Sequence, residues 1–187
     1  YGPGLEGALL VGLVVAKTMA TTLNIPFIAV NHLHGHIYAN FLMDKGPKFP
    51  FITLLVSGGH TMLVKAQNHF EFEDIGRTRD DACGEAFDKV ARVLGLSYPG
   101  GPIIERKAIS GNKSAFKFPR AMIKQGLEFS FSGLKTAVIQ TVKELNDKKK
   151  ELPVEDIAAS FQACVADILV EKSKRACQEY GFSTLVI

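Results

Sequence analysis

Residues 51–65 form two apolar runs rich in strand-forming side chains, separated by a Ser-Gly-Gly-His turn at positions 57–60. β-Branched and aromatic residues favour strands, and paired glycines tolerate the positive φ angles of tight hairpin turns. The sequence therefore predicts a β-hairpin here. Because Gly58 and Gly59 lack Cβ atoms, an anion can also approach their backbone N–H groups, with the Ser57 hydroxyl beside them. An ordinary hairpin turn and a phosphate-binding turn both fit this pattern.

Apolar periodicity predicts further helices and strands on both sides of the hairpin. Helices are expected near residues 5–20, 32–43, 80–94, 102–109, 134–145 and 154–180, and strands near residues 26–30, 70–75 and 184–187. Ser132 is the expected N-cap of the helix near 134–145. The glycine and proline content of residues 44–50 indicates a linker. We therefore place a lobe boundary here, with the end of a first lobe at residues 1–48 and a second lobe, cut short at its C-terminal end, at residues 49–187.

Two features bear on the compartment. The apolar run 5–20 contains Glu6 and Lys17 and is shorter than the roughly 20 residues that a membrane span needs. We expect it to form a helix buried in a soluble core, with no membrane association. The three cysteines, Cys83, Cys164 and Cys177, lack C-x-x-C spacing. This argues against a disulfide framework or a zinc knuckle and favours a reducing compartment.

The charge distribution permits a nucleic acid partner without arguing for one. The formal net charge is only +3, so position matters more than the total. Six basic residues lie in residues 105–124, with Phe116 and Phe118 between them: Arg106, Lys107, Lys113, Lys117, Arg120 and Lys124. Such a patch can hold phosphates, and a solvated surface fits the same residues.

A cluster of histidines in residues 31–36 is a candidate metal site. On a helix, His32 and His36 lie about one turn apart on one face, which is the spacing that two imidazoles need to share a metal ion. His34 points to roughly the opposite side. A metalloprotease of the H-E-x-x-H kind needs Glu beside the first His, but that position is Leu33. A shared metal ion, a polar surface and hydrogen-bonded core histidines all fit this pattern.

A second candidate site is the acidic segment 80–88, which a Pro-Gly-Gly-Pro loop follows at 99–102. Asp81, Glu85 and Asp88 are spaced to share one helix face. Such a face repels itself unless a cation, ligand hydroxyls or basic side chains satisfy it. A solvated face is the alternative.

Several motifs, in this order along the chain, resemble the TsaD family, formerly called Gcp or O-sialoglycoprotein endopeptidase. They are Gly-Pro-Gly-Leu at 2–5, the histidines at 31–36, the turn at 57–61, the acidic segment with Tyr-Pro-Gly-Gly-Pro at 98–102, and Phe-Ser-Phe-Ser-Gly-Leu-Lys-Thr at 129–136. The resemblance covers essentially the whole chain. Several motifs in the right order are far more specific than any one of them.

The resemblance implies a two-lobed α/β fold of the actin, Hsp70 and sugar-kinase (ASKHA) type, with a nucleotide held between the lobes. It also implies a cytoplasmic acyltransferase. This enzyme would move threonylcarbamoyl from threonylcarbamoyl-AMP to N6 of the adenosine 3′ of the anticodon, in tRNAs that read codons beginning with A. Partner proteins of the TsaB and TsaE type are implied in the same way.

The resemblance also implies roles for individual residues. His32 and His36 match ligands of one Fe²⁺ or Zn²⁺ ion per subunit. The residues that match substrate contacts are Leu55, Val56, Ser57, Gly58 and Gly59 for the phosphate and acyl part, and Asp88, Gly101 and Glu105 for the nucleoside. On this basis the metal is expected to polarise the threonylcarbamoyl group while the Gly-Gly turn holds the AMP phosphate. No serine or cysteine with a positioned base is evident, which favours direct transfer over a covalent intermediate.

The chain departs from the family's motifs in two ways, and two other functions fit parts of the sequence. The family's histidine motif usually has Glu where this chain has His34, and its later asparagine contact and third metal ligand, an aspartate, fall beyond Ile187. Because the chain also opens on Tyr1, we expect a fragment of a longer protein, inactive by itself. The rivals are a metalloprotease, against which Leu33 counts, and a non-catalytic nucleotide-binding scaffold.

Overall fold

The computed structural model describes all residues from Tyr1 to Ile187, which form two compact units, Tyr1–Lys48 and Phe49–Ile187. The division falls inside the segment 44–50 that the sequence marks as a linker. The assignment of the two units to lobes of an ASKHA fold stays a prediction.

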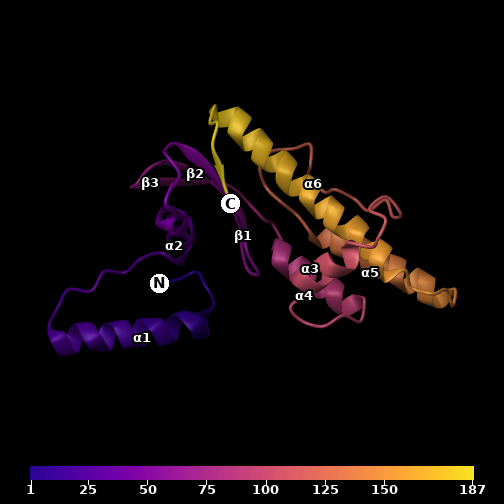
Figure 1. Ribbon diagram of the computed structural model, residues 1–187, viewed down its shortest axis with the longest axis horizontal. Coiled ribbons are helices and arrows are strands. Elements are labelled where there is room, and N and C mark those ends of the chain that lie inside the picture. The colour runs from indigo at the N-terminus through magenta and orange to yellow at the C-terminus, as the bar shows by residue number, and fades with distance from the viewer. The chain divides into compact units, whose positions relative to one another are not determined.

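A four-stranded mixed sheet in the order β3-β2-β1-β4 organises the second unit (Figure 1). Strands β1 (Phe51–Val56) and β2 (Thr61–Asn68) pair antiparallel, and β3 (Glu71–Arg77) pairs antiparallel with β2. The short strand β4 (Leu185–Val186) runs parallel to β1. The predicted hairpin is therefore confirmed, with residues 57–60 as its turn, and so is the α/β class.

Four helices lie together beside this sheet (Figure 1). They are α3 (Cys83–Val93), α4 (Gly100–Ala108), α5 (Ser132–Asp147) and α6 (Val154–Tyr180). The prediction for α6 is confirmed in full. Helix α3 begins later than the expected residue 80, because Ala82 is still extended with φ −68° and ψ 156°. Ser132 is the first residue of α5 and not its N-cap, so that prediction is wrong by one position.

The core of the second unit is built from phenylalanine rings and aliphatic side chains between the sheet and the helices. Phe129, Phe131 and Phe161 are completely buried. The Phe161 ring on α6 meets Phe87 on α3 edge to face, with 5.0 Å between the ring centroids. This contact contributes about 1 kcal/mol beyond the burial of the two rings. It therefore helps to fix α3 and α6 relative to each other.

The first unit contains helices α1 (Glu6–Leu23) and α2 (His32–Ala39) and the short 3₁₀ helix η1 (Asn40–Leu42). The strand predicted near residues 26–30 is wrong: this segment is irregular and has no strand beside it to supply ladder hydrogen bonds. Within this unit the only buried side chain is that of Ile37.

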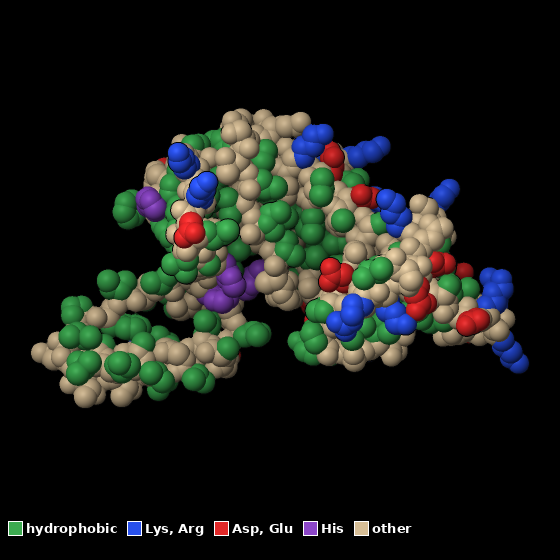
Figure 2. Space-filling view, in the orientation of Figure 1, with side chains coloured by type: hydrophobic (Ala, Val, Ile, Leu, Met, Phe, Trp, Pro, Cys, Tyr) green, Lys and Arg blue, Asp and Glu red, His purple; other side chains and the backbone are tan.

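Helix α1 is formed as predicted, but its expected burial is wrong. None of its residues is buried, and Figure 2 shows hydrophobic side chains over its surface. The physical reason is that no second helix or sheet of this unit packs along it. Its 18 residues and mean hydropathy of 1.4 also meet the length and composition criteria for crossing a membrane, which core helices and signal sequences also satisfy. This single helix is weak evidence for a membrane span.

Candidate functional site

The turn between β1 and β2 is held by its own side chain and by its neighbour α3. The Ser57 hydroxyl accepts a hydrogen bond from the His60 backbone N–H at 3.0 Å, and the Ser57 N–H donates to the His60 carbonyl at 2.8 Å. The Gly84 N–H donates to the Ser57 carbonyl at 3.2 Å. The Thr61 hydroxyl, which is buried, accepts from the Cys83 N–H at 2.8 Å. The first amides of α3 are therefore used to anchor the hairpin.

The backbone amides of Gly58 and Gly59 have no hydrogen-bond partner in the protein. Neither glycine adopts a positive φ angle, so the expectation that the turn needs glycine for its backbone conformation is wrong. A Cβ atom at either position would meet no atom within 4 Å, so packing does not require glycine either. What the two glycines provide is open access to two backbone N–H groups without a partner in the protein, which an approaching anion can use.

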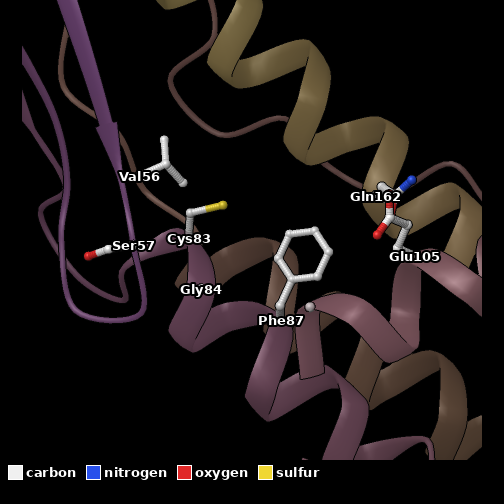
Figure 3. Close-up of a pocket in the computed structure, with 8 residues that line it drawn as sticks. Val56, Ser57, Cys83, Gly84, Phe87, Glu105 and Gln162 are labelled. Atoms are coloured by element: carbon white, nitrogen blue, oxygen red, sulfur yellow. The ribbon is translucent and has the colours of Figure 1, made fainter. Parts of the chain in front are cut away.

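A cavity of about 370 Å³ lies next to this turn (Figure 3). Four of the residues predicted to contact substrate line it: Val56, Ser57, Gly101 and Glu105. They come from the end of β1, from the turn and from α4. The other four, Leu55, Gly58, Gly59 and Asp88, are not among its lining residues. The structure thus brings together positions that are far apart in the sequence.

Four further residues line the same cavity and were missed as site residues from sequence. Cys83, Gly84 and Phe87 lie in the acidic segment, where the sequence pattern marks only the carboxylates as candidate site residues. Gln162 lies within the long helix α6, and no motif marks it. Figure 3 shows the Phe87 ring between the turn on one side and Gln162 with Glu105 on the other.

Two glycines near the cavity have a packing role. A Cβ on Gly84 would lie 2.7 Å from the Ser57 carbonyl oxygen. A Cβ on Gly100 would lie 2.5 Å from the Phe87 carbonyl oxygen. Both distances are too short for any Cβ contact, so these glycines let α3 approach the turn and let α4 approach α3. Gly84 also lines the cavity, whereas Gly100 does not.

The Asp88 carboxylate is hydrogen-bonded to the backbone at the start of the next helix, α4. Its Oδ1 accepts a hydrogen bond from the Gly100 N–H at 2.7 Å, at the first residue of α4. A carboxylate at a helix N-terminus stabilises the helix through its orphan amides and its dipole. Asp88 therefore positions α4, the helix that carries Gly101 and Glu105 into the cavity.

Basic side chains neutralise the remaining acids of the segment, which was one of the expected possibilities. Asp81 pairs with Lys89 at 2.7 Å and with Lys135 at 2.6 Å, and Glu85 also pairs with Lys89 at 2.7 Å. Burial raises the pKa of Asp81, but the hydrogen bonds and charges of Lys135 and Lys89 outweigh it, so its pKa is lowered overall. This acidic cluster joins α3 to α5 and has no unpaired carboxylate left for a cation.

Asp80 joins the same two helices from a different side. Its carboxylate accepts hydrogen bonds from the Ser130 and Ser132 hydroxyls at 2.6 and 2.7 Å, and from the Phe131 and Ser132 amides at 2.8 and 3.2 Å. Burial raises the pKa of Asp80, and these hydrogen bonds lower it by more. Asp80 therefore caps α5, which is the role that the sequence assigned to Ser132.

The Cys83 thiol faces the cavity but is not a nucleophile. Its residue is only 3% exposed, and burial raises its pKa to about 12. A thiol with such a pKa is almost entirely protonated at neutral pH, and only the thiolate attacks. The surroundings of Cys83 therefore do not activate it for attack.

In the first unit, α2 brings His32 and His36 together as its spacing predicts. Their Nε2 atoms are 3.1 Å apart, with ring centroids separated by 4.5 Å. Two nitrogen ligands on one tetrahedral metal, each at about 2.05 Å, would be about 3.3 Å apart. The helix start that fixes the pair is capped by the Asn31 side chain, which accepts from the Leu33 and His34 amides at 2.9 and 3.3 Å.

The pair fits two ligand positions of a metal ion but does not complete a site. Residues 1–187 contain no group of three or more His, Cys, Asp or Glu side chains arranged to hold a metal. The two histidines line a cavity of about 410 Å³ within the first unit, together with Asn31 and Gly35. Within the first unit, no further side chain of these kinds is grouped with the pair.

The basic stretch in residues 105–124 is less positive in the structure than in the sequence. Lys107 pairs with Glu155 at 2.8 Å, and Arg120 pairs with Asp167 at 2.6 Å. The rings of Phe116 and Phe118 stack on each other with centroids 5.7 Å apart, and Phe118 is only 6% exposed. These rings pack towards the core and do not offer a platform for bases.

The model of the TsaD family, described as tRNA N6-adenosine threonylcarbamoyltransferase, matches residues 1–187. A tRNA N6-adenosine threonylcarbamoyltransferase of Desulfitobacterium hafniense is 54% identical over 188 residues, covering 100% of this chain and 55% of the relative. Proteins of the same name from Clostridioides difficile and Caldicellulosiruptor saccharolyticus are 51% and 52% identical, each over 100% of this chain and about 55% of their own length. The chain thus spans about half the length of the curated relatives it matches. It belongs to the TsaD family.

Proposed function

We propose that the protein carrying this chain is a tRNA N6-adenosine threonylcarbamoyltransferase. Its donor would be threonylcarbamoyl-AMP, and its acceptor the adenosine 3′ of the anticodon in tRNAs that read codons beginning with A. Membership of the TsaD family supports this proposal. Because the chain spans about half of its relatives, the proposal concerns the longer protein and includes an ASKHA-type fold, a cytoplasmic location and partners of the TsaB and TsaE type.

The observation that carries the proposal within this chain is the pair of free amides in the β1–β2 turn. Neither backbone angle nor packing requires Gly58 or Gly59, yet both leave an N–H open to an approaching anion. The AMP phosphate is the anion that we assign to this turn. The neighbouring cavity of about 370 Å³ then takes the nucleoside.

The residues of this chain support direct transfer. The N6 nitrogen of adenosine attacks the carbamoyl carbon, the bond from that carbon to the phosphate oxygen breaks, and AMP leaves with the electron pair while N6 loses a proton. The Gly58 and Gly59 amides would stabilise the charge that develops on the leaving phosphate. Burial raises the pKa of the Cys83 thiol in this cavity to about 12, so it stays protonated, which argues against an acyl intermediate on this cysteine.

His32 and His36 would hold one Fe²⁺ or Zn²⁺ ion, since their Nε2 atoms lie 3.1 Å apart. When bound, such an ion acts as a Lewis acid that polarises an acyl oxygen. His32→Ala and His36→Ala should each strip the metal measured by mass spectrometry of the purified full-length protein. His34→Ala should leave metal content nearly unchanged, and equal loss from all three variants would contradict the assignment.

The function is tested by incubating the full-length protein with threonylcarbamoyl-AMP, unmodified tRNA and partners of the TsaB and TsaE type, and measuring the modified nucleoside. Gly58→Ala and Gly59→Ala should abolish most of the product without lowering thermal stability, because the added Cβ meets no protein atom. Gly12→Ala in α1, where a Cβ also meets nothing, is the matched control and should retain activity.

Two outcomes would replace the proposal. Nucleotide binding without any tRNA modification would favour a non-catalytic scaffold. Cleavage of a sialoglycoprotein that depends on His32 and His36 would favour a metalloprotease, although Leu33 stands where the general base of such an enzyme belongs.

A further inference from the structure

Gln162 presents a polar side chain to the cavity without a partner in the protein. It lies on α6 beside the completely buried Phe161, is half-buried itself, and its amide makes no hydrogen bond within the chain. Ser160, two residues earlier, shows the contrast: its hydroxyl accepts from the Phe116 amide and donates to the Asn112 carbonyl, both at 3.2 Å. An amide left half-buried without partners loses hydrogen bonds to water unless a ligand replaces them.

The surroundings of Gln162 fit a flat, partly apolar ligand. The Phe87 ring and the Val56 side chain line the same cavity. In Figure 3, Gln162 and Glu105 lie on the side of the Phe87 ring opposite to the turn. The side chain of Glu105 also has no partner in the protein. The same cavity also includes Val56 and Ser57, at the end of β1 and in the turn, so a ligand that fills it from the turn towards α6 would meet an amide and a carboxylate.

We propose that Gln162 is a specificity-determining residue that selects adenine in the nucleotide held by this cavity. This inference rests on the proposed function, which supplies the adenylate. An amide side chain can pair with adenine in two places at once: its oxygen accepts from the N6 amino group and its NH₂ donates to N7. Guanine and hypoxanthine present an oxygen at position 6, which faces the amide oxygen and cannot donate to it. Glu105 then accepts from a ribose hydroxyl, a role that suits a carboxylate.

The experiment measures binding of three nucleotides to the full-length protein by calorimetry. AMP tests the complete pattern, IMP replaces the N6 amino group by oxygen, and 7-deaza-AMP replaces N7 by a carbon. Wild-type protein should bind AMP about 5- to 150-fold more tightly than IMP, and should also lose affinity for 7-deaza-AMP. Gln162→Leu should remove both preferences. Gln162→Glu keeps an acceptor for N6 but has no donor, so it should lose only the sensitivity to N7.

Gln178→Leu is the matched control, because Gln178 is exposed on the same helix and does not line the cavity. It should keep both preferences. If Gln162→Leu still binds AMP and keeps the wild-type ratio of AMP affinity to IMP affinity, Gln162 does not select adenine. The nucleotide site itself would not be contradicted by that result. If wild-type protein binds neither AMP nor IMP, the nucleotide site itself is overturned, and the role of Gln162 with it.

Discussion

The two units of this chain differ sharply in how far their own residues hold them together. In Phe49–Ile187, buried phenylalanines, three ion pairs around Asp81 and Glu85 and the ties from Asp80 and Asp88 join the sheet and the helices. In Tyr1–Lys48, Ile37 is the only buried side chain and α1 exposes apolar residues on all sides.

This difference means that the two candidate sites are held in position by different kinds of contacts. The turn and its cavity are positioned by tertiary contacts within their own unit. The histidine pair is positioned by the local geometry of one short helix and its cap. Substitutions should therefore cost much more stability in the second unit than in the first, unless residues outside the first unit cover α1.

The largest contrast is expected between Phe161→Ala and Val14→Ala in the full-length protein. Phe161 is completely buried, so its removal leaves a cavity and should cost about 3–5 kcal/mol in unfolding free energy. Val14 is 53% exposed on α1, and its change should cost no more than about 0.5 kcal/mol. Denaturant titration measures both. A loss above about 1 kcal/mol at Val14 would show that a surface outside the unit Tyr1–Lys48 covers α1.

The next largest difference in stability is expected between alanine substitutions at a glycine of β3 and at a glycine of α1. A Cβ on Gly76 in β3 would lie 2.3 Å from the Leu127 carbonyl oxygen, so Gly76→Ala must move backbone and should cost about 1–3 kcal/mol. A Cβ on Gly12 in α1 meets nothing within 4 Å, and alanine favours a helix, so Gly12→Ala should stabilise by about 0.5–1 kcal/mol. Thermal melts of the two variants decide this. Equal destabilisation would mean that α1 is packed.

A smaller effect is expected from the ion pairs of Asp81. Asp81→Asn should cost about 1–2 kcal/mol, because Lys89 and Lys135 lose a partner whose side chain is only 13% exposed. The lowered pKa of Asp81 means that its contribution is present above the ordinary value of 3.8 and is lost as pH falls through the folded-state pKa. The difference between wild type and variant should therefore be constant at neutral pH and shrink below pH 3.8. Asp147→Asn, exposed and unpaired, is the control.

The smallest effect on stability, but a specific local one, is expected from Gly4→Ala. The added Cβ would lie 2.6 Å from Cδ2 and 2.7 Å from Nε2 of the His32 ring, so the ring must move. Metal content should fall while the melting temperature changes little. Gly2→Ala, whose Cβ meets nothing within 4 Å, should retain the metal. Full metal retention in Gly4→Ala would show that the His32 ring has room to adjust.

The local sequence pattern alone predicted several structural features of this chain correctly. Residue spacing predicted the hairpin, the bounds of α6, and the approach of His32 to His36, because each depends on contacts within a few residues along the chain. The motifs at 57–61, 80–88 and 129–136 are enough by themselves to indicate the TsaD family.

The tertiary structure decided what each motif residue does. Asp80, Asp81 and Asp88 each have a partner far away in the sequence, in the segment before α5, in α5 and in α4 respectively. Only the tertiary structure shows that these carboxylates connect helices. No sequence pattern distinguishes Gln162, because a single polar residue in a long helix is usually on the surface. Only the structure shows that it lines a cavity. The exposure of α1 was equally hidden, because an apolar helix predicts a partner but does not say whether the same stretch of chain provides it.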